Sequence, residues 1–185
     1  MDSVTAAPKT SLMAPGLKYG LIAAAGMTAW LLVCHVLDVH TTHIGASQYT
    51  DWITELILVL ALWRMLYDQL YAPNRYWLPV WVGLLQGLFA SLIAAMGYYI
   101  AFSLYLHFIN PNYPDFYLEW RFALMRAAGR PEVEIGTMAR TFRWSMGPTG
   151  LPVTIGGFYL LIGIVASPIL TLWLNWRRKE VVDPR

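Results

Sequence analysis

Three long apolar runs constrain this chain more than any other feature of its sequence. Residues 17–37 carry a charge only at Lys18, near the start of the run, and residues 78–109 and 151–176 carry none. A helix that crosses a bilayer needs about 20 mostly apolar residues, and each run reaches that length. Each run therefore predicts a membrane-spanning helix.

The composition agrees with a membrane protein. Hydrophobic residues make up 57% of the 185 residues and charged residues only 13%, whereas soluble domains carry about 25% charged residues. Such a chain has too few charges to cover a globular surface, and a formal net charge of +2 does not indicate nucleic acid as a partner. Cys34 is the only cysteine and cannot form an internal disulfide. We expect one transmembrane domain over residues 1–185, with membrane lipids as neighbours.

A fourth span is predicted over residues 49–71, where the apolar pattern is interrupted by Glu55 and Arg64. Both charges lie toward the ends of the segment, where a long side chain can reach the interface. Four spans place both termini on one side of the membrane. Lys and Arg are more frequent on the cytoplasmic side, and eight of them flank the termini and the 72–77 loop, against five in the long loop after span three. We therefore expect cytoplasmic termini.

Two short amphipathic helices are predicted in that long outer loop, over residues 114–128 and 131–144. Pro131 opens the second, with Glu132 and Glu134 at its positive end and Arg140 near its negative end. The predicted fold is thus an all-α bundle of four transmembrane helices with two loop helices. These helices either cover their own bundle or offer a contact surface to a partner. For the second alternative the best candidates are Trp120, Phe122 and Phe142.

Small residues recur at intervals of four along the spans. Such rows permit close approach of helix backbones inside lipid, where burial of apolar surface does not drive association. The longest rows suggest that spans one and three lie against each other. The helix-packing residues predicted from them are Gly16, Gly20, Ala24, Gly83, Gly87 and Ser91.

The four histidines lie near the predicted outer face, close in sequence to Asp38, Asp51 and Glu55. A solvated polar loop is the simplest interpretation. Two alternatives remain open: a metal site formed by His35, His40 and His43, and axial ligation of haem or chlorophyll by His35 or His107. No cofactor is required by the sequence, although lipids or pigments are compatible with it.

The layout resembles the DUF4199 family, bacterial four-span proteins of unknown function. The resemblance covers about residues 16–179. It rests on the segment Leu17-Lys18-Tyr19-Gly20-Leu21, on Arg64 with the polar stretch to Asn74, on Gly83 and Gly87, and on Phe108-Ile109-Asn110-Pro111. It implies a bacterial inner membrane protein with the four-span topology. No catalytic residues are implied by it.

No nucleophile elbow, P-loop, dinucleotide-binding glycine pattern or zinc-protease motif occurs in the sequence. We therefore expect a protein that is not an enzyme. The first hypothesis is an accessory subunit of a larger membrane complex, bound to other integral membrane subunits, with a photosynthetic or respiratory energy-transducing complex as a candidate host. The alternative is a stand-alone transporter or an ion- or metal-binding membrane protein that uses Glu55, Arg64 and Gln86.

Overall fold

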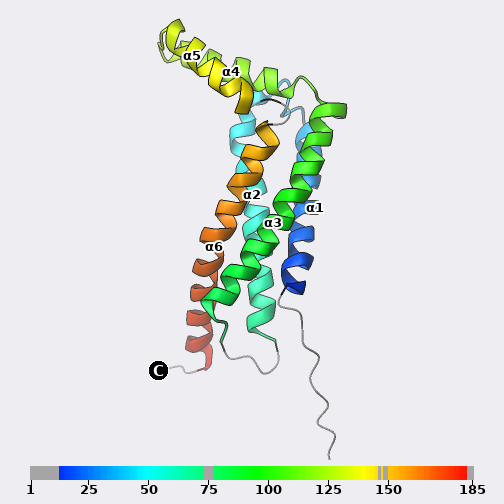
Figure 1. The fold of residues 1–185 in the computed structure, drawn as a ribbon, viewed down its shortest axis with the longest axis vertical. Coiled ribbons are helices and arrows are strands. Elements are labelled where there is room, and N and C mark those ends of the chain that lie inside the picture. Colours follow the sequence, from blue (N-terminus) through cyan, green and yellow to red (C-terminus); the bar gives the residue numbers. More distant parts are fainter. Residues whose placement is uncertain (1–12, 73–76, 146, 148–149, 183–185) are drawn as a thin grey trace, which may run out of the picture.

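The structure is a computed structural model that describes residues 13–72, 77–145, 147 and 150–182. All regular elements in this part of the chain are helical (Figure 1). The four long helices are α1 (Ala14–Val36), α2 (Ser47–Leu70), α3 (Val80–Leu104) and α6 (Gly150–Val182). The shorter elements are the 3₁₀ helix η1 (Ile44–Ala46), the π-helix η2 (Tyr105–Ile109), α4 (Tyr113–Ala127) and α5 (Glu132–Ser145). The predicted all-α class is confirmed for the described residues.

Three helical segments are long and apolar enough to cross a membrane: Ala14–Val36, Val80–Ile109 and Gly150–Lys179. The helix α2 is of similar length, but its charged residues keep it outside this group. Of the basic residues counted for the orientation, Lys9, Arg75 and Arg185 lie outside the described residues. Prolines mark the start of two of the long helices. Pro15 lies in the first turn of α1, and Pro79 directly precedes α3.

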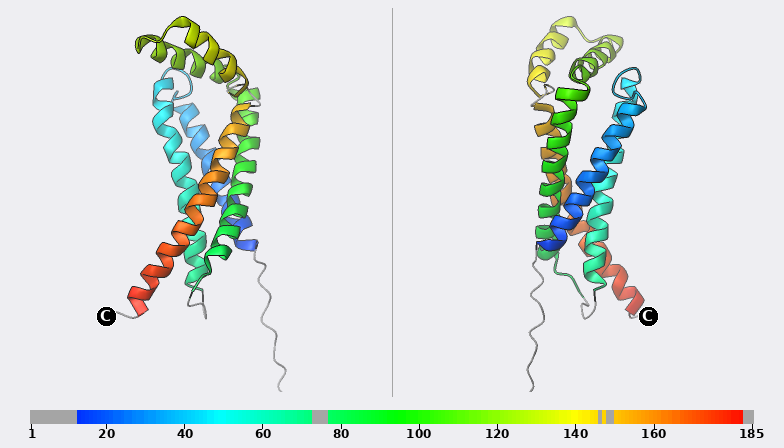
Figure 2. Two further views of the ribbon diagram at one scale, coloured as in Figure 1. Left: turned by 60° about the vertical axis from the view of Figure 1, so that its left-hand side comes forward. Right: turned by 90° about the vertical axis from the view of Figure 1, so that its right-hand side faces the viewer.

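The four long helices form a ring in the order α1, α3, α6, α2. The contacts between α3 and α6 and between α1 and α3 are the most extensive, followed by those between α1 and α2 and between α2 and α6. The helices α4 and α5 form a helical hairpin that lies across one end of this ring, beside the connection between α1 and α2 (Figure 2). We call this the hairpin end of the bundle. The connection between α2 and α3 lies at the opposite end.

A seam of small residues joins α3 to α6. A Cβ atom placed on Gly83 would overlap Thr171, one on Gly87 would overlap Ser167, and one on Gly163 would overlap Ser91. The hydroxyls of Ser167 and Thr171 donate to carbonyl oxygens one turn back in α6, at 2.6 and 2.7 Å. The two backbones therefore approach closely without leaving these two hydroxyls unpaired.

The small-residue row of α3 packs on α6, whereas the sequence suggested that it packs on span one, which is α1. Spans one and three do lie together, but Gly16 and Gly20 face Phe89, Ala90 and Ile93 of α3 rather than the glycines of the seam. Of the predicted packing residues, Ala24 lies against Gly97, and Gly83, Gly87 and Ser91 face α6. The spacing of small residues correctly marks close helix faces. It does not say which helix meets which face, because several rows of similar length compete.

Beyond the seam, toward the hairpin end, the same two helices carry large aromatic side chains. Tyr98 of α3 meets Tyr159 of α6 edge to face, with ring centroids 5.5 Å apart, and stacks on Phe102. The opposite end is closed by polar contacts. Asn175 of α6 accepts from the backbone N–H of Leu78 and donates to its carbonyl, at 3.1 and 2.8 Å.

We predict that Gly87→Ala lowers the thermal unfolding temperature of the detergent-solubilised protein, because its methyl group overlaps Ser167. Overpacking of this kind costs about 1–3 kcal/mol. Gly157→Ala is the matched control, since nothing lies within 4 Å of its added Cβ. An equal or higher unfolding temperature for Gly87→Ala would contradict the close α3–α6 seam.

Candidate functional site

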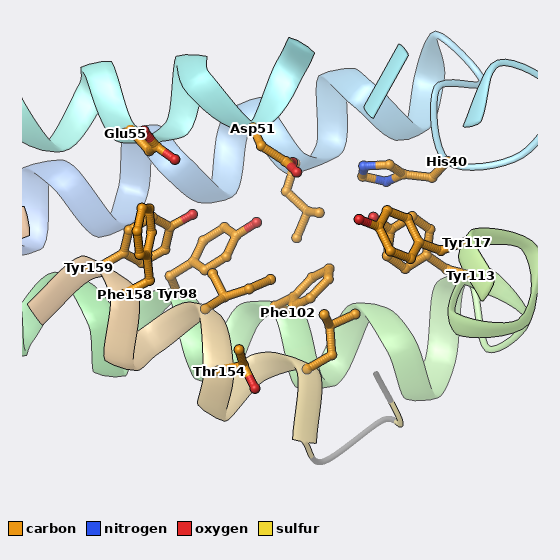
Figure 3. A pocket seen from close by; sticks show the side chains of 13 residues that line it. His40, Asp51, Glu55, Tyr98, Phe102, Tyr113, Tyr117, Thr154, Phe158 and Tyr159 are labelled. Carbon is orange, nitrogen blue, oxygen red and sulfur yellow. The ribbon is translucent and has the colours of Figure 1, made fainter. Parts of the chain in front are cut away.

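A cavity of about 310 Å³ lies at the hairpin end of the bundle, where α3 and α6 carry their aromatic residues. Its walls come from five helices and from the α1–α2 loop, as Figure 3 shows. The lining residues are Leu31, His40, Asp51, Glu55, Tyr98, Phe102, Tyr113, Tyr117, Leu151, Thr154, Ile155, Phe158 and Tyr159. The cavity therefore combines aromatic walls with a small set of polar groups, which is typical of small-molecule sites.

Two carboxylates line the cavity from α2. Asp51 and Glu55 are four residues apart, so both lie on one face of the helix, and Figure 3 shows both on the cavity side of α2. Within the described part of the chain, neither carboxylate has an ion-pair partner, since the ion pairs found there are Arg64–Asp68, Arg126–Glu132 and Arg130–Glu134. The site thus carries negative charge that the described residues do not balance.

Tyrosine hydroxyls surround these carboxylates. Tyr113 begins α4, is only 6% exposed, and its hydroxyl points into the cavity (Figure 3). Among the described residues no hydrogen bond to this hydroxyl is found, although its ring packs on His40, Phe102 and Tyr117. Burial raises the pKa of Tyr113 well above its ordinary value and also raises the pKa of Tyr117. Both groups therefore stay protonated near neutral pH and can donate a hydrogen bond into the cavity.

A hydrogen-bond network closes the cavity on the loop side. The hydroxyl of Tyr105 lies 2.9 Å from Nδ1 of His40 and 3.3 Å from Nδ1 of His35. The Nδ2 group of Asn110 donates to the same hydroxyl at 3.1 Å and to the backbone carbonyl of His40 at 3.2 Å. Tyr105 thus joins α1, the α1–α2 loop and the end of α3.

Local backbone geometry brings these residues together. The helix α1 ends in a turn in which Asp38 adopts a positive φ of 54°, and the N–H of Val39 donates back to Cys34 at 3.0 Å. This Schellman-type turn folds the loop back over the bundle. The last turn of α3 is the π-helix η2, closed by the N–H of Asn110 donating to Tyr105 at 2.8 Å. Such π-turns are frequent at functional sites.

The imidazole of His40 is neutral at physiological pH. Burial, together with the neighbouring His35, lowers the pKa of His40 from 6.5 to about 4. A neutral ring keeps an acceptor nitrogen available for the Tyr105 hydroxyl and adds no positive charge to the cavity. The carboxylates of Asp51 and Glu55 therefore gain no counter-ion from this histidine.

The structure separates the residues of the predicted metal site. His35 and His40 both meet Tyr105, whereas His43 is exposed and lies near Thr42. Within the described residues, no group of three or more His, Cys, Asp or Glu side chains is arranged to hold a metal ion. The predicted three-histidine site therefore has no support from this geometry and stays a prediction. The physical reason is that the chain leaves the α1 helix before His40 and turns His43 outward.

The predicted tetrapyrrole ligands also lie apart from the cavity. His107 is exposed on the π-helix and its Nδ1 bonds to the carbonyl of Ser103 at 2.7 Å. His35 is half-buried beside Tyr105, with ring centroids 5.5 Å apart. Neither histidine lines the cavity. Axial ligation by either residue stays an untested prediction without support from this geometry.

The three polar residues of the predicted transport pathway are in three different places. Glu55 lines the cavity, whereas Arg64 is exposed and pairs with Asp68 at 2.9 Å. Gln86 is buried toward the opposite end, where its Nε2 donates to Gln69 at 2.8 Å. Only Glu55 therefore belongs to the candidate site.

The predicted contact aromatics on the hairpin are half-buried. Trp120 packs on Gly45 of η1, where an added Cβ would lie 3.3 Å from its Nε1. This contact ties α4 to the α1–α2 loop and favours, for Trp120, the alternative in which the hairpin covers its own bundle. Phe122 and Phe142 are also intermediate in exposure. Their role as partner contacts stays a prediction.

Sequence reasoning missed most of the cavity. The sequence relates Asp51 only to the neighbouring histidines, and its patterns assign no site role to Tyr98, Tyr113, Tyr117 or Tyr159. Two signals were present in the sequence: Asp51 with Glu55 and Tyr113 with Tyr117 are both spaced by four residues. Each spacing aligns two polar groups on one helix face. Without knowledge of how α2, α4 and α6 meet, nothing indicates that these faces converge.

Comparison of the chain with protein-family models, curated proteins and solved structures finds no match. The resemblance to the DUF4199 family therefore stays a prediction. The function has to be inferred from the site itself.

We predict that Tyr105→Phe destabilises the protein, because His40, His35 and Asn110 lose their shared partner. An unsatisfied buried polar group costs about 1–3 kcal/mol. Tyr99→Phe, at an exposed position on the same helix, is the control. Thermal unfolding in detergent measures both, and equal unfolding temperatures for the two variants would show that the network contributes nothing.

We also predict a pH dependence that His40 causes. Its pKa of about 4 in the folded protein lies below the ordinary value of 6.5, so between these pH values the unfolded chain binds more protons. The stability that neutral His40 provides is complete above pH 6.5 and is lost as the pH falls toward 4. The unfolding temperature should therefore fall more between pH 7 and about pH 4.5 in the wild type than in His40→Gln. An equal fall in unfolding temperature in the wild type and in His40→Gln would refute the assignment of this pH dependence to His40.

Proposed function

We propose that this chain is a four-span membrane protein that binds a small molecule in the cavity at its hairpin end. One observation carries the proposal. Within the described residues, a partly open cavity of about 310 Å³ is lined by two carboxylates without ion-pair partners and by Tyr113, a buried residue whose hydroxyl makes no hydrogen bond. Small-molecule sites combine apolar walls with a few convergent polar groups, so polar side chains that converge on a cavity without protein partners are a reason to expect a ligand.

The helix α2 is the proposed fourth span. It has 24 residues and runs beside α1 along the bundle, as Figures 1 and 2 show. Its outward face carries Trp52, Leu56 and Leu60, each more than half exposed. Its inward face is also mainly apolar, with two polar side chains at Thr54 and Gln69. The low average hydropathy of α2 therefore reflects the charged residues toward its two ends, which are Asp51, Glu55, Arg64 and Asp68. The exposed side chains of Trp52, Leu56 and Leu60 are apolar, so this face of α2 can contact lipid.

The proposed orientation places both termini in the cytoplasm, and a bacterial inner membrane follows if the family resemblance holds. Arg177 and Lys179 are exposed at the end of α6 opposite the hairpin. Basic residues next to a span favour the cytoplasmic side. On this arrangement the cavity opens in the outer half of the membrane, and the α4–α5 hairpin lies at the outer surface.

Binding, rather than catalysis, is the proposed role. The imidazole that lines the cavity, His40, is neutral, and its Nδ1 lies 2.9 Å from the phenol hydroxyl of Tyr105. Among the described residues, no serine, threonine or cysteine side chain is found hydrogen-bonded to this imidazole. The carboxylates and tyrosines can hold and orient a ligand by charge and by hydrogen bonds. The proposal therefore keeps the expectation from the sequence that this protein is not an enzyme.

A second candidate function, an accessory subunit of a membrane complex, is supported by the surface of the hairpin. Val133 of α5 is 83% exposed, and Leu124 and Phe116 of α4 are also exposed. Phe122 and Phe142 lie half-buried beside these residues on the same two helices. Apolar side chains gathered on a projecting element are typical of a partner or membrane-surface contact.

Native mass spectrometry of the protein extracted gently from the cells that make it separates these functions. The proposed function predicts a bound small molecule that is absent from Thr154→Trp, in which a larger side chain at this exposed lining position narrows the cavity. A stable heteromeric assembly without such a molecule would favour the subunit. A bare protein from both the wild type and the variant would overturn the binding proposal.

We predict that Thr42→Cys and Trp77→Cys, made in a Cys34→Ala background, are labelled from opposite sides of sealed vesicles by a membrane-impermeant maleimide. These exposed positions flank α2 in sequence, so opposite labelling means that α2 crosses the bilayer. Val133→Cys is the reference for the side that carries the hairpin, and Thr42→Cys should label with it. Labelling of Thr42→Cys and Trp77→Cys from one side would exclude the fourth span.

A further inference from the structure

The chemistry of the cavity walls narrows the class of ligand. Asp51 and Glu55 supply negative charge from one wall, and the opposite walls are formed by aromatic rings, among them Tyr98, Phe102 and Phe158. Figure 3 shows the carboxylates of α2 facing the rings of α3 and α6 across the open space. Carboxylates attract a cation directly, and the faces of aromatic rings attract it through their quadrupole.

From this arrangement we infer that the cavity binds an organic cation that carries an ammonium group. The inference rests on the proposed ligand-binding function and adds the class of ligand to it. An ammonium group beside Asp51 and Glu55 supplies the positive charge that the described residues do not provide. The unbonded hydroxyl of Tyr113 supplies a hydrogen bond to a polar group elsewhere on the same molecule.

The size and lining of the site argue against a bare metal ion. A cavity of about 310 Å³ lies at the lower end of the range of about 300–1,000 Å³ for small-molecule sites, which suits a small organic molecule. Hard metal cations require six or more oxygen ligands, whereas the described residues contain no group of three or more candidate ligands. A neutral apolar ligand fits poorly as well, because it would leave two carboxylates without a partner in a partly enclosed site.

Exposed residues on either side of the cavity indicate how a ligand enters. Asp51 of α2 and Thr154 and Phe158 of α6 line the cavity and are all exposed. The opening therefore lies between α2 and α6, next to the hairpin. An ammonium group could reach it on a free amine or on the headgroup of a lipid, and the two sources share the same recognition chemistry.

The experiment compares choline with 3,3-dimethylbutan-1-ol, in which a neutral tert-butyl group replaces the trimethylammonium group. Binding to the purified full-length protein is measured by isothermal titration calorimetry in nanodiscs of phosphatidylglycerol. The inference predicts that choline binds at least about tenfold more tightly than its neutral analogue. Asp51→Asn and Glu55→Gln should each weaken choline binding by a similar factor, whereas Glu119→Gln, on the exposed face of α4, should not change it.

Three outcomes would overturn the inference. Equal affinity for the two compounds, or choline affinity unchanged in both Asp51→Asn and Glu55→Gln, would leave a ligand-binding cavity that does not select a cation. Binding of neither compound would remove choline-like cations as ligands, while a bound molecule in native mass spectrometry would still support the proposed function. If one carboxylate variant does not fold, the other provides the same test.

A second arm identifies the source of the cation. Nanodiscs in which half of the phosphatidylglycerol is replaced by phosphatidylethanolamine present ammonium headgroups beside the opening between α2 and α6. Weaker apparent choline binding in these discs supports the inference, with the headgroup as the competing source. Unchanged binding that still depends on Asp51 supports it with a free amine as the source.

Discussion

Small side chains let α3 and α6 approach until no room is left for a Cβ atom at Gly83, Gly87 or Gly163. The helices α1 and α2 then pack around this pair, α1 mainly on α3 and α2 on both α1 and α6. The cavity lies beyond the hairpin-side end of this seam of small residues. Beyond the seam, Tyr98 and Tyr159 take the place of glycine and serine between α3 and α6, and their rings line the cavity opposite α2.

The loop side of this space is closed by a network with one hydroxyl at its centre. Tyr105 contacts His35 in the last turn of α1, His40 in the α1–α2 loop and Asn110 in the turn before α4. Asn110 also holds the backbone of His40, so the loop and the start of α4 are fixed together. Because Tyr113 lies just beyond this turn, the same network places the unbonded hydroxyl over the cavity.

The sequence predicts the helices well because a long apolar run has few alternatives in a membrane. The observed helix ends differ from the ends of the apolar runs where prolines or charged residues determine the helix terminus. The helix α1 begins at Ala14, before the apolar run, since Pro15 suits a first turn, and α6 continues to Val182 through basic residues that favour a helix C-terminus. The small-residue rows correctly predict that spans one and three lie together, but not that Gly83, Gly87 and Ser91 face α6, because rows on three helices allow more than one match.

The candidate site was harder to predict than the fold for a physical reason. Its residues come from five helices and a loop. The sequence of these segments does not indicate where each one lies relative to the others in the folded protein. His35 and His40 illustrate the same limit. They are poorly aligned for a helix, yet both reach Tyr105 because the positive φ of Asp38 folds the loop back.

The central claim is that an ammonium group lies between the carboxylates of α2 and the aromatic rings of the cavity. Nuclear Overhauser effects between the methyl protons of bound choline and the ring protons of the full-length protein test it most directly. We expect effects to the rings of Tyr98, Phe102 and Phe158, together with shifts of the carboxyl carbons of Asp51 and Glu55. Effects confined to exposed rings such as Trp176, with no change at either carboxyl, would contradict the claim.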